Sequence, residues 1–145
     1  MNEQRRLRIA GLHHVTVLCR DMQRSADFYR NVLGMRLVRQ TVSDDDDAAR
    51  HLFFGDERGR PGTLVTCLEY PQLEDGKAGP GAAHHFALAV ESVEELAAWR
   101  DYLGSRGIPC TEVMERGPYS SVYLRDPDGH IVELAAGAGE LVAEE

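Results

Sequence analysis

The chain has 145 residues, of which 43% are hydrophobic and 28% charged, and its formal net charge at pH 7 is -8. This length and composition predict a single soluble domain with a core of its own. The negative balance argues against nucleic acid or an anionic membrane as the main partner, because both attract a basic surface.

The cysteines and the N-terminal segment bear on where the protein works. Cys19, Cys67 and Cys110 are widely spaced and form no C-x-x-C pair. An odd number of isolated cysteines suits a reducing compartment, and we expect all three to be small core residues. Residues 1–9 carry three arginines, but no long apolar segment follows them as in a secretory signal, and no later segment is apolar enough to span a bilayer. We therefore expect a cytoplasmic protein.

The first half of the chain predicts a strand, a helix and three further strands. Asp21 is a suitable N-cap for a helix over 22–33, whose apolar side chains recur at helical spacing and which Gly34 ends. The predicted strands cover 12–19, 35–42, 51–54 and 63–70.

Four consecutive aspartates at 44–47 lie between the second and third of these strands. Neighbouring carboxylates diverge and repel one another, and the run lacks the spaced ligands and the glycine of a calcium loop. We expect a solvated loop there rather than a metal site.

The second half repeats the plan after a linker at 71–81 that is rich in glycine, proline and charge. Ser92 caps a predicted helix over 93–103, and Glu95 completes a capping box. Residues 126–129 are a strong turn signal. The predicted strands cover 83–90, 108–114, 120–124 and 130–135, and we expect the tail to residue 145 to be loose or a short helix.

Two histidine pairs occupy matching places in the two halves. His13 and His14 follow a small-residue lead-in and precede an apolar run, and His84 and His85 do the same. Two copies of an unusual local pattern in one short chain indicate internal duplication.

The duplication predicts the fold. Each half is a βαβββ unit whose one helix covers one face of a four-stranded sheet and leaves the other face open. Pairing two such units gives an α+β fold in which two modules, 8–71 and 81–136, form a cleft-shaped barrel. Counting from Gly62 and Gly129 gives Thr66 the position in the first half that Glu133 has in the second, just as His14 is equivalent to His85.

If the modules pair pseudo-symmetrically, His14, His85 and Glu133 point into one cleft. Two imidazoles and one carboxylate are the typical ligands of non-haem Fe(II) oxygenases, although Mn(II), Zn(II) or Ni(II) can occupy such a set. Thr66 at the fourth position is a poor ligand, which favours a three-ligand site.

Simpler interpretations remain open for each of these residues. A strand histidine is often only hydrogen-bonded, and Glu133 lies in an apolar run where its carboxylate either faces water or needs a cation. We expect His51 and His130 to be surface or loop residues.

Three stretches resemble the vicinal oxygen chelate superfamily, which includes glyoxalases, bleomycin-resistance proteins and extradiol dioxygenases: HVTV at 14–17, FYRNVLGM at 28–35 and YLRDPDGHIVEL at 123–134. Within that superfamily the chain is most similar to hydroquinone-type ring-cleaving dioxygenases. Residues 11–16, 37–42, 51–57 and 61–63 resemble their opening module, and 84–85 and 116–133 their closing module. Those enzymes carry four such modules, whereas this chain has two.

The resemblance implies Fe(II) or Mn(II) held by His14, His85 and Glu133. It also implies residues around a substrate such as a para-hydroquinone, with Arg116 holding a phenolate or superoxide charge and Tyr123 or His84 passing a proton to an oxygen intermediate. The full implied set around the substrate is His13, Thr16, His84, Arg116 and Tyr123. Arg116 could equally be a surface residue, and Tyr123 a core aromatic.

The sequence thus predicts a metal-dependent extradiol-type dioxygenase that acts on a small phenolic substrate, hydroquinone or catechol, and O2. The alternatives are a glyoxalase-type isomerase or lyase, a thiol transferase, and a non-enzymatic drug-binding protein of the bleomycin-resistance kind. We expect a homodimer, because paired βαβββ units leave sheet edges to be covered. The site could lie within one chain, or join His14 of one chain to His85 and Glu133 of another.

Overall fold

The structure, a computed structural model, describes residues 6–43, 49–137, 139 and 141. The aspartates at 44–47 and most of the tail beyond residue 137 lie outside the described residues. Within them, no helix is both long enough and apolar enough to cross a bilayer.

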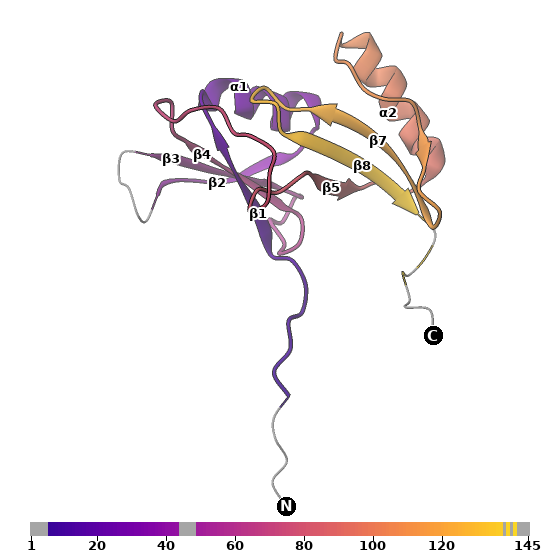
Figure 1. Cartoon of the computed structure of the whole chain (residues 1–145), viewed down its shortest axis with the longest axis horizontal. Helices are drawn as coiled ribbons and strands as arrows, with labels where there is room; N and C mark the ends of the chain where they lie inside the picture. Colours follow the sequence, from indigo (N-terminus) through magenta and orange to yellow (C-terminus); the bar gives the residue numbers. More distant parts are fainter. Residues whose placement is uncertain (1–5, 44–48, 138, 140, 142–145) are drawn as a thin grey trace, which may run out of the picture.

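Two separate four-stranded sheets make up the fold, and they confirm the predicted α+β class with two βαβββ modules (Figure 1). The first sheet has the order β1-β4-β3-β2, and the second has the equivalent order β5-β8-β7-β6. In each, the outer parallel pair, β1 with β4 or β5 with β8, is followed by antiparallel neighbours. In the part of the chain that is described, the sheets do not close into a barrel. The strands are β1 (His14–Cys19), β2 (Arg36–Val42), β3 (Arg50–Gly55), β4 (Leu64–Glu69), β5 (Phe86–Ala89), β6 (Met114–Glu115), β7 (Tyr119–Arg125) and β8 (Ile131–Gly137).

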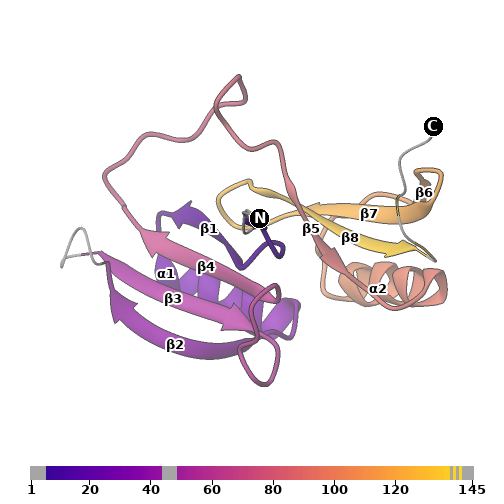
Figure 2. The ribbon, with the colours of Figure 1, turned by 90° about the horizontal axis from the view of Figure 1, so that it is seen from below.

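The helices lie on one side of the sheets, and the opposite faces are left open (Figure 1). Seen from that open side, the two sheets lie side by side with β1 and β5 facing the space between them, and the linker loops from β4 to β5 (Figure 2). The hydrophobic core lies between the helices and the sheets, where side chains such as Val17, Val65, Leu96 and Val132 are buried.

The predicted helix over 22–33 forms, but with an irregular second half. Asp21 caps α1 (Met22–Ala26) by accepting from two backbone N–H groups, and the chain continues into the π-helical η1 (Asp27–Val32). There, Leu33 N donates to Phe28 O at 2.9 Å, five residues back. The wider turn places the adjacent Phe28 and Tyr29 both in the core.

Two other predicted elements differ from the structure. The strand expected at 83–90 begins only at Phe86, so His84 and His85 precede β5. The segment expected to be extended at 108–114 contributes only the bridge from Cys110 to Leu124 and the first residue of the short β6. The second helix, α2 (Val93–Ser105), begins at the predicted Ser92 cap and runs two residues beyond the predicted end. Cys19 and Cys67 are buried core residues as expected, and Cys110 is half-buried.

The turn between β7 and β8 fastens the second module to the first. Tyr29 Oη donates to Asp126 Oδ2 at 2.9 Å, and the His130 ring lies 2.8 Å from Leu18 O at the outer edge of β1. Tyr102 Oη of α2 donates to Val32 O at 2.8 Å. Polar contacts, of which the one between Tyr29 and Asp126 is buried, therefore join the two modules in addition to the shared core.

Asp126 is expected to make stability fall with rising pH. Burial raises the pKa of its carboxyl, although His130, Tyr29 and the backbone N–H groups it accepts from oppose the shift. The folded protein then holds the proton more tightly than the unfolded chain, so the free energy of unfolding falls as pH rises from roughly 3.9, the unfolded value, through the raised folded value. Asp126→Asn keeps an acceptor oxygen and should remove this slope, as measured by urea unfolding over a pH series.

Asp56 provides a control of opposite sign. The backbone N–H of Arg60, together with its side chain, lowers the pKa of Asp56 to about 2. Its contribution is present above the unfolded value and is lost as pH falls, so Asp56→Asn should change only the acidic limb of the same series. Identical profiles for wild type and Asp126→Asn would contradict the role assigned to Asp126.

Candidate active site

Glu133 is a buried carboxylate on the open face of the second sheet. Its neighbours in β8, Val132 and Leu134, pack into the core, so strand alternation points Glu133 to the other side. It is nevertheless only 3% exposed. One carboxylate oxygen, Oε2, accepts from the Ser121 hydroxyl of the adjacent β7, and the other, Oε1, lies 2.8 Å from His85 Nε2. A carboxylate buried this deeply requires a cation or several donors.

The second histidine pair lies beside this carboxylate. Because His85 precedes β5, its ring reaches Glu133 while its side chain stays 34% exposed. Its other nitrogen, Nδ1, is 2.8 Å from His84 Nδ1, and the two rings meet edge to face. His84 therefore fixes the orientation of His85.

An aromatic ring and a guanidinium complete this group. Tyr123 lies directly opposite Glu133 in the β7–β8 ladder, and its ring centroid is 5.9 Å from that of His85. Arg116 Nε donates to Tyr123 Oη at 3.1 Å, and its guanidinium lies over the Tyr123 ring at 5.2 Å. The structure thus places five of the predicted site residues next to one another on the second sheet: His84, His85, Arg116, Tyr123 and Glu133.

The other predicted residues lie on the open face of the first sheet. His13 Nδ1 and His14 Nδ1 are 3.0 Å apart, as in the second pair. The hydroxyls of Thr16 and Thr66 are 2.7 Å apart, and His51 Nε2 lies 2.9 Å from the same Thr66 hydroxyl. His51 lies in β3, within the strand predicted over 51–54, but it is half-buried, so the expectation that it is a surface or loop residue was wrong.

The strand registers show that the histidine-containing group of the first sheet (His13, His14, Thr16, His51 and Thr66) and that of the second sheet (His84, His85, Arg116, Tyr123 and Glu133) are copies of one arrangement. Thr66 pairs with Thr16 in β1 and with Phe53 in β3, and Glu133 pairs with Ala87 in β5 and Tyr123 in β7. Thr66 therefore occupies the place of Glu133, and His14, two residues before Thr16, occupies the place of His85. The counting from Gly62 and Gly129 gave the same correspondence.

The donor set on the second sheet fits a metal. Two ligand atoms at about 2.1 Å from one ion lie roughly 3 Å apart at a right angle, and His85 Nε2 and Glu133 Oε1 are 2.8 Å apart. Within the described residues of one chain, however, no three His, Cys, Asp or Glu side chains come close enough to hold an ion together. His14 is not part of the group that contains His85 and Glu133.

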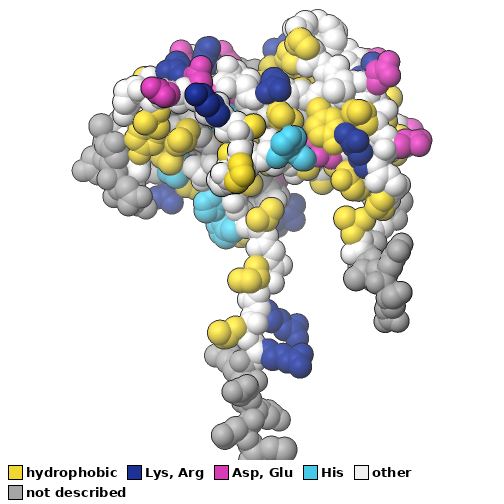
Figure 3. Space-filling view, viewed as in Figure 1, with side chains coloured by type: hydrophobic (Ala, Val, Ile, Leu, Met, Phe, Trp, Pro, Cys, Tyr) yellow, Lys and Arg dark blue, Asp and Glu magenta, His cyan; other side chains and the backbone are white. Residues whose placement is uncertain are grey.

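A cavity of about 1130 Å³ separates the two groups. It is lined by β1, by residues 82–88 before and within β5, by the linker and by the β7–β8 turn, and both histidine pairs border it. Figure 3 shows histidine side chains at the surface on the open side of the molecule and between the sheets. The cavity is bordered by two outermost strands, because β1 and β5 each end their sheet.

Sequence reasoning missed four residues of these groups. Ser121 lies two residues before Tyr123 and so shares its face of β7, a spacing that could have identified it. His51, Phe53 and Arg39 lie on the open face of the first sheet, where Arg39 stands over the Phe53 ring.

Comparison with known proteins identifies the family. Residues 11–134 match the model of the Glyoxalase/Bleomycin resistance protein/Dioxygenase superfamily. The chain belongs to this superfamily.

Relatives within the superfamily include named dioxygenases. The chain is 36% identical to "Putative ring-cleaving dioxygenase MhqO" of Bacillus subtilis, over 86% of this chain and 39% of that protein. It is also 36% identical to chlorohydroquinone/hydroquinone 1,2-dioxygenase of Sphingobium indicum, over 83% of this chain and 38% of that protein. The crystal structure of a "putative dioxygenase" from Bacillus subtilis superposes with a TM-score of 0.80 at 36% identity, covering 87% of this chain and 40% of that one. The chain thus spans about two fifths of the length of these relatives.

Proposed function

We propose that the protein is a metal-dependent, extradiol-type ring-cleaving dioxygenase that acts on a small phenolic substrate, a hydroquinone or a catechol, with O2. The observation that carries this proposal is the buried Glu133 carboxylate beside His85 on an open sheet face, 2.8 Å from its Nε2. The similarity to named ring-cleaving and hydroquinone dioxygenases supports it. Three free cysteines suit work in the cytoplasm.

In this proposal His14, His85 and Glu133 hold a divalent ion, with Fe(II) favoured. When bound, the ion would supply Lewis acidity that lowers the pKa of a phenolic hydroxyl and so favours its reaction with O2. Ser121 and His84 orient Glu133 and His85 through their hydrogen bonds, as outer partners of ligands do.

The remaining predicted residues handle charge and protons. Arg116 is exposed and directed at the Tyr123 hydroxyl, so it can neutralise a phenolate there while Tyr123 or His84 transfers a proton. Thr16 and His13 border the other side of the cleft, beside His14.

We also infer that the site is shared between two chains of a homodimer. His14 lies on the first sheet and His85 with Glu133 on the second, and one chain does not bring the three together. Among the described strands, β1, which begins at His14, and β5, which follows His85, are edge strands with one neighbour each. The carbonyl oxygens of His13 and Cys19 accept from Gly62 N and Tyr70 N on the β4 side. Because successive backbone groups of a strand point to alternate sides, the backbone groups of His14 and Thr16 point away from β4, where a second strand can pair with them.

An isomerase of the glyoxalase type is less well supported. Such a reaction needs a fourth ligand or a base at the position of Thr66. The hydroxyl of Thr66 is buried and engaged by Thr16 and His51. Oxygen uptake with a panel of hydroquinones and catechols separates the two reactions.

The first test is the metal content of wild type beside His85→Ala. After anaerobic loading with Fe(II) and dialysis, wild type is expected to retain iron and His85→Ala to lose it, with a matching loss of oxygen uptake. His130→Ala, a histidine outside both groups, serves as the control and should retain iron. Iron bound equally by all three proteins, or iron without oxygen uptake on any phenol, would contradict the proposal.

A further inference from the structure

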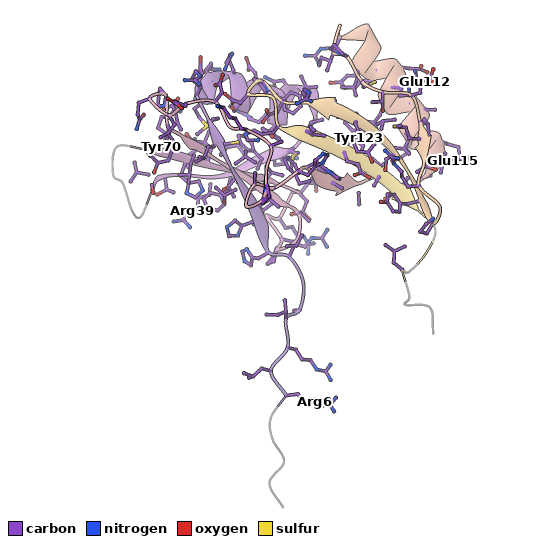
Figure 4. The ribbon with its side chains drawn as sticks, in the orientation of Figure 1. Arg6, Arg39, Tyr70, Glu112, Glu115 and Tyr123 are labelled. Carbon is purple, nitrogen blue, oxygen red and sulfur yellow. The ribbon has the colours of Figure 1, made fainter. Side chains whose placement is uncertain are left out.

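The open face of the first sheet carries a second pair of an aromatic ring and an arginine. Phe53 lies opposite Thr66 just as Tyr123 lies opposite Glu133. The Arg39 guanidinium lies 5.4 Å from the Phe53 ring centroid, close to the 5.2 Å between Arg116 and Tyr123. Figure 4 shows Arg39 on the first sheet, on the side away from α1, and Tyr123 on the second sheet. The duplication therefore extends beyond the histidines.

The chemistry of this second pair differs from that of the first. A threonine replaces the metal-binding carboxylate, and its hydroxyl is held by Thr16 and His51. Phe53 has no hydroxyl to bind the arginine, and among the described residues nothing accepts a hydrogen bond or a salt bridge from Arg39. Among the described residues, this part of the first sheet thus presents the apolar Phe53 ring and the exposed Arg39 guanidinium with no carboxylate beside them.

Phe53 and Arg39 lie beside the proposed metal ligand His14. The Phe53 ring centroid is 6.3 Å from that of His14 and 4.4 Å from that of His51. An aromatic substrate held near His14 would therefore reach the Phe53 ring, and a substituent on its far side would reach Arg39.

We propose that Phe53 and Arg39 form the ring-binding subsite, which selects an aromatic substrate carrying an anionic oxygen on the side away from the metal ligands. Phe53 packs against the ring, and Arg39 binds the anionic group. His51, fixed by Thr66, forms the flank of this subsite. The proposal rests on the proposed function for the identity of the reaction, but the binding itself needs no turnover.

The test measures binding of two probes by titration calorimetry under anaerobic conditions: 4-hydroxybenzoate, an anionic ring, and phenol, a neutral one. Arg39→Ala is expected to weaken 4-hydroxybenzoate about 10-fold or more, the effect of losing a hydrogen bond to a charged group, and phenol by less than about 2-fold. Arg36→Ala on the same strand, whose guanidinium is 3.8 Å from Glu57, is the matched control and should change neither.

Phe53→Leu keeps an apolar side chain and removes the aromatic face, so it should weaken both probes by a similar factor while the melting temperature stays near that of wild type. Equal affinities in wild type and Arg39→Ala, or equal losses in Arg39→Ala and Arg36→Ala, would overturn the subsite. Arg39-dependent binding in a protein that takes up no oxygen would support the subsite and contradict the dioxygenase, so the two failures are distinguishable.

Discussion

Glu133→Gln is expected to abolish iron retention and oxygen uptake while leaving the fold intact. Glutamine has the same shape and can still bond Ser121 and His85, but it lacks the charge that a divalent ion requires. Since outer partners of ligands alone are worth 10- to 100-fold in metal affinity, we expect a loss of at least about 100-fold. The readouts are bound Fe(II) per chain and oxygen uptake with hydroquinone.

Glu115→Gln is the matched control, because Glu115 lies on β6 at the far edge of the same sheet and is exposed (Figure 4). It should bind iron as wild type does. The metal-free Glu133→Gln protein should melt at the same temperature as metal-free wild type or higher, because a buried amide costs less than a buried carboxylate. Full iron binding by Glu133→Gln would remove Glu133 from the ligand set.

Mixing two inactive variants is expected to restore activity if the site is shared between chains. His14→Ala lacks the ligand of the first module, and His85→Ala lacks that of the second. In a mixed dimer one site contains both substitutions and the other contains neither. Random pairing at equal amounts makes half of the dimers mixed, so about a quarter of wild-type activity should return.

The mixture needs co-expression with two different tags, so that the mixed dimer can be purified and its oxygen uptake compared with that of each parent. The control is a chain carrying both substitutions, paired with wild type. Each site of that mixed dimer contains one substitution, so the purified mixed dimer should show no oxygen uptake. Purified mixed dimers without activity, or active protein that sediments as a monomer, would place the whole site within one chain.

The sequence predicts which positions of the two modules are equivalent only where the turns have the same length in both. Gly62 and Gly129 stand the same distance before Thr66 and Glu133, so counting forward from them gives the correct pairing in β4 and β8. Counting backward fails, because ten residues separate Phe54 from its partner Val65 but only seven separate Leu124 from Val132. The correspondence of Phe53 with Tyr123 is therefore visible only in the ladders.

Other differences have local causes that composition does not show. Periodicity predicts the helix over 22–33 but cannot reveal that its second half is π-helical, because Phe28 and Tyr29 are both apolar enough for the core in either geometry. The half-buried position of His51 was unexpected because a polar residue at the first position of a short predicted strand usually faces water. Its partner, Thr66, is fifteen residues away. Whether His14 and His85 meet depends on how two modules or two chains are arranged, which no local pattern encodes.

The parallel pairing of β1 with β4 has a consequence for how the protein is made. Thr16 pairs with Thr66, fifty residues later, and among the described strands β1 pairs with β4 alone. While the chain leaves the ribosome, β2 and β3 can form a hairpin early, but β1 must wait for the end of its own half. The same order recurs in the second half, where β5 waits for β8. Each module thus completes its sheet only with its last strand, and until then the apolar side of its first strand is a target for chaperones or for a neighbouring nascent chain.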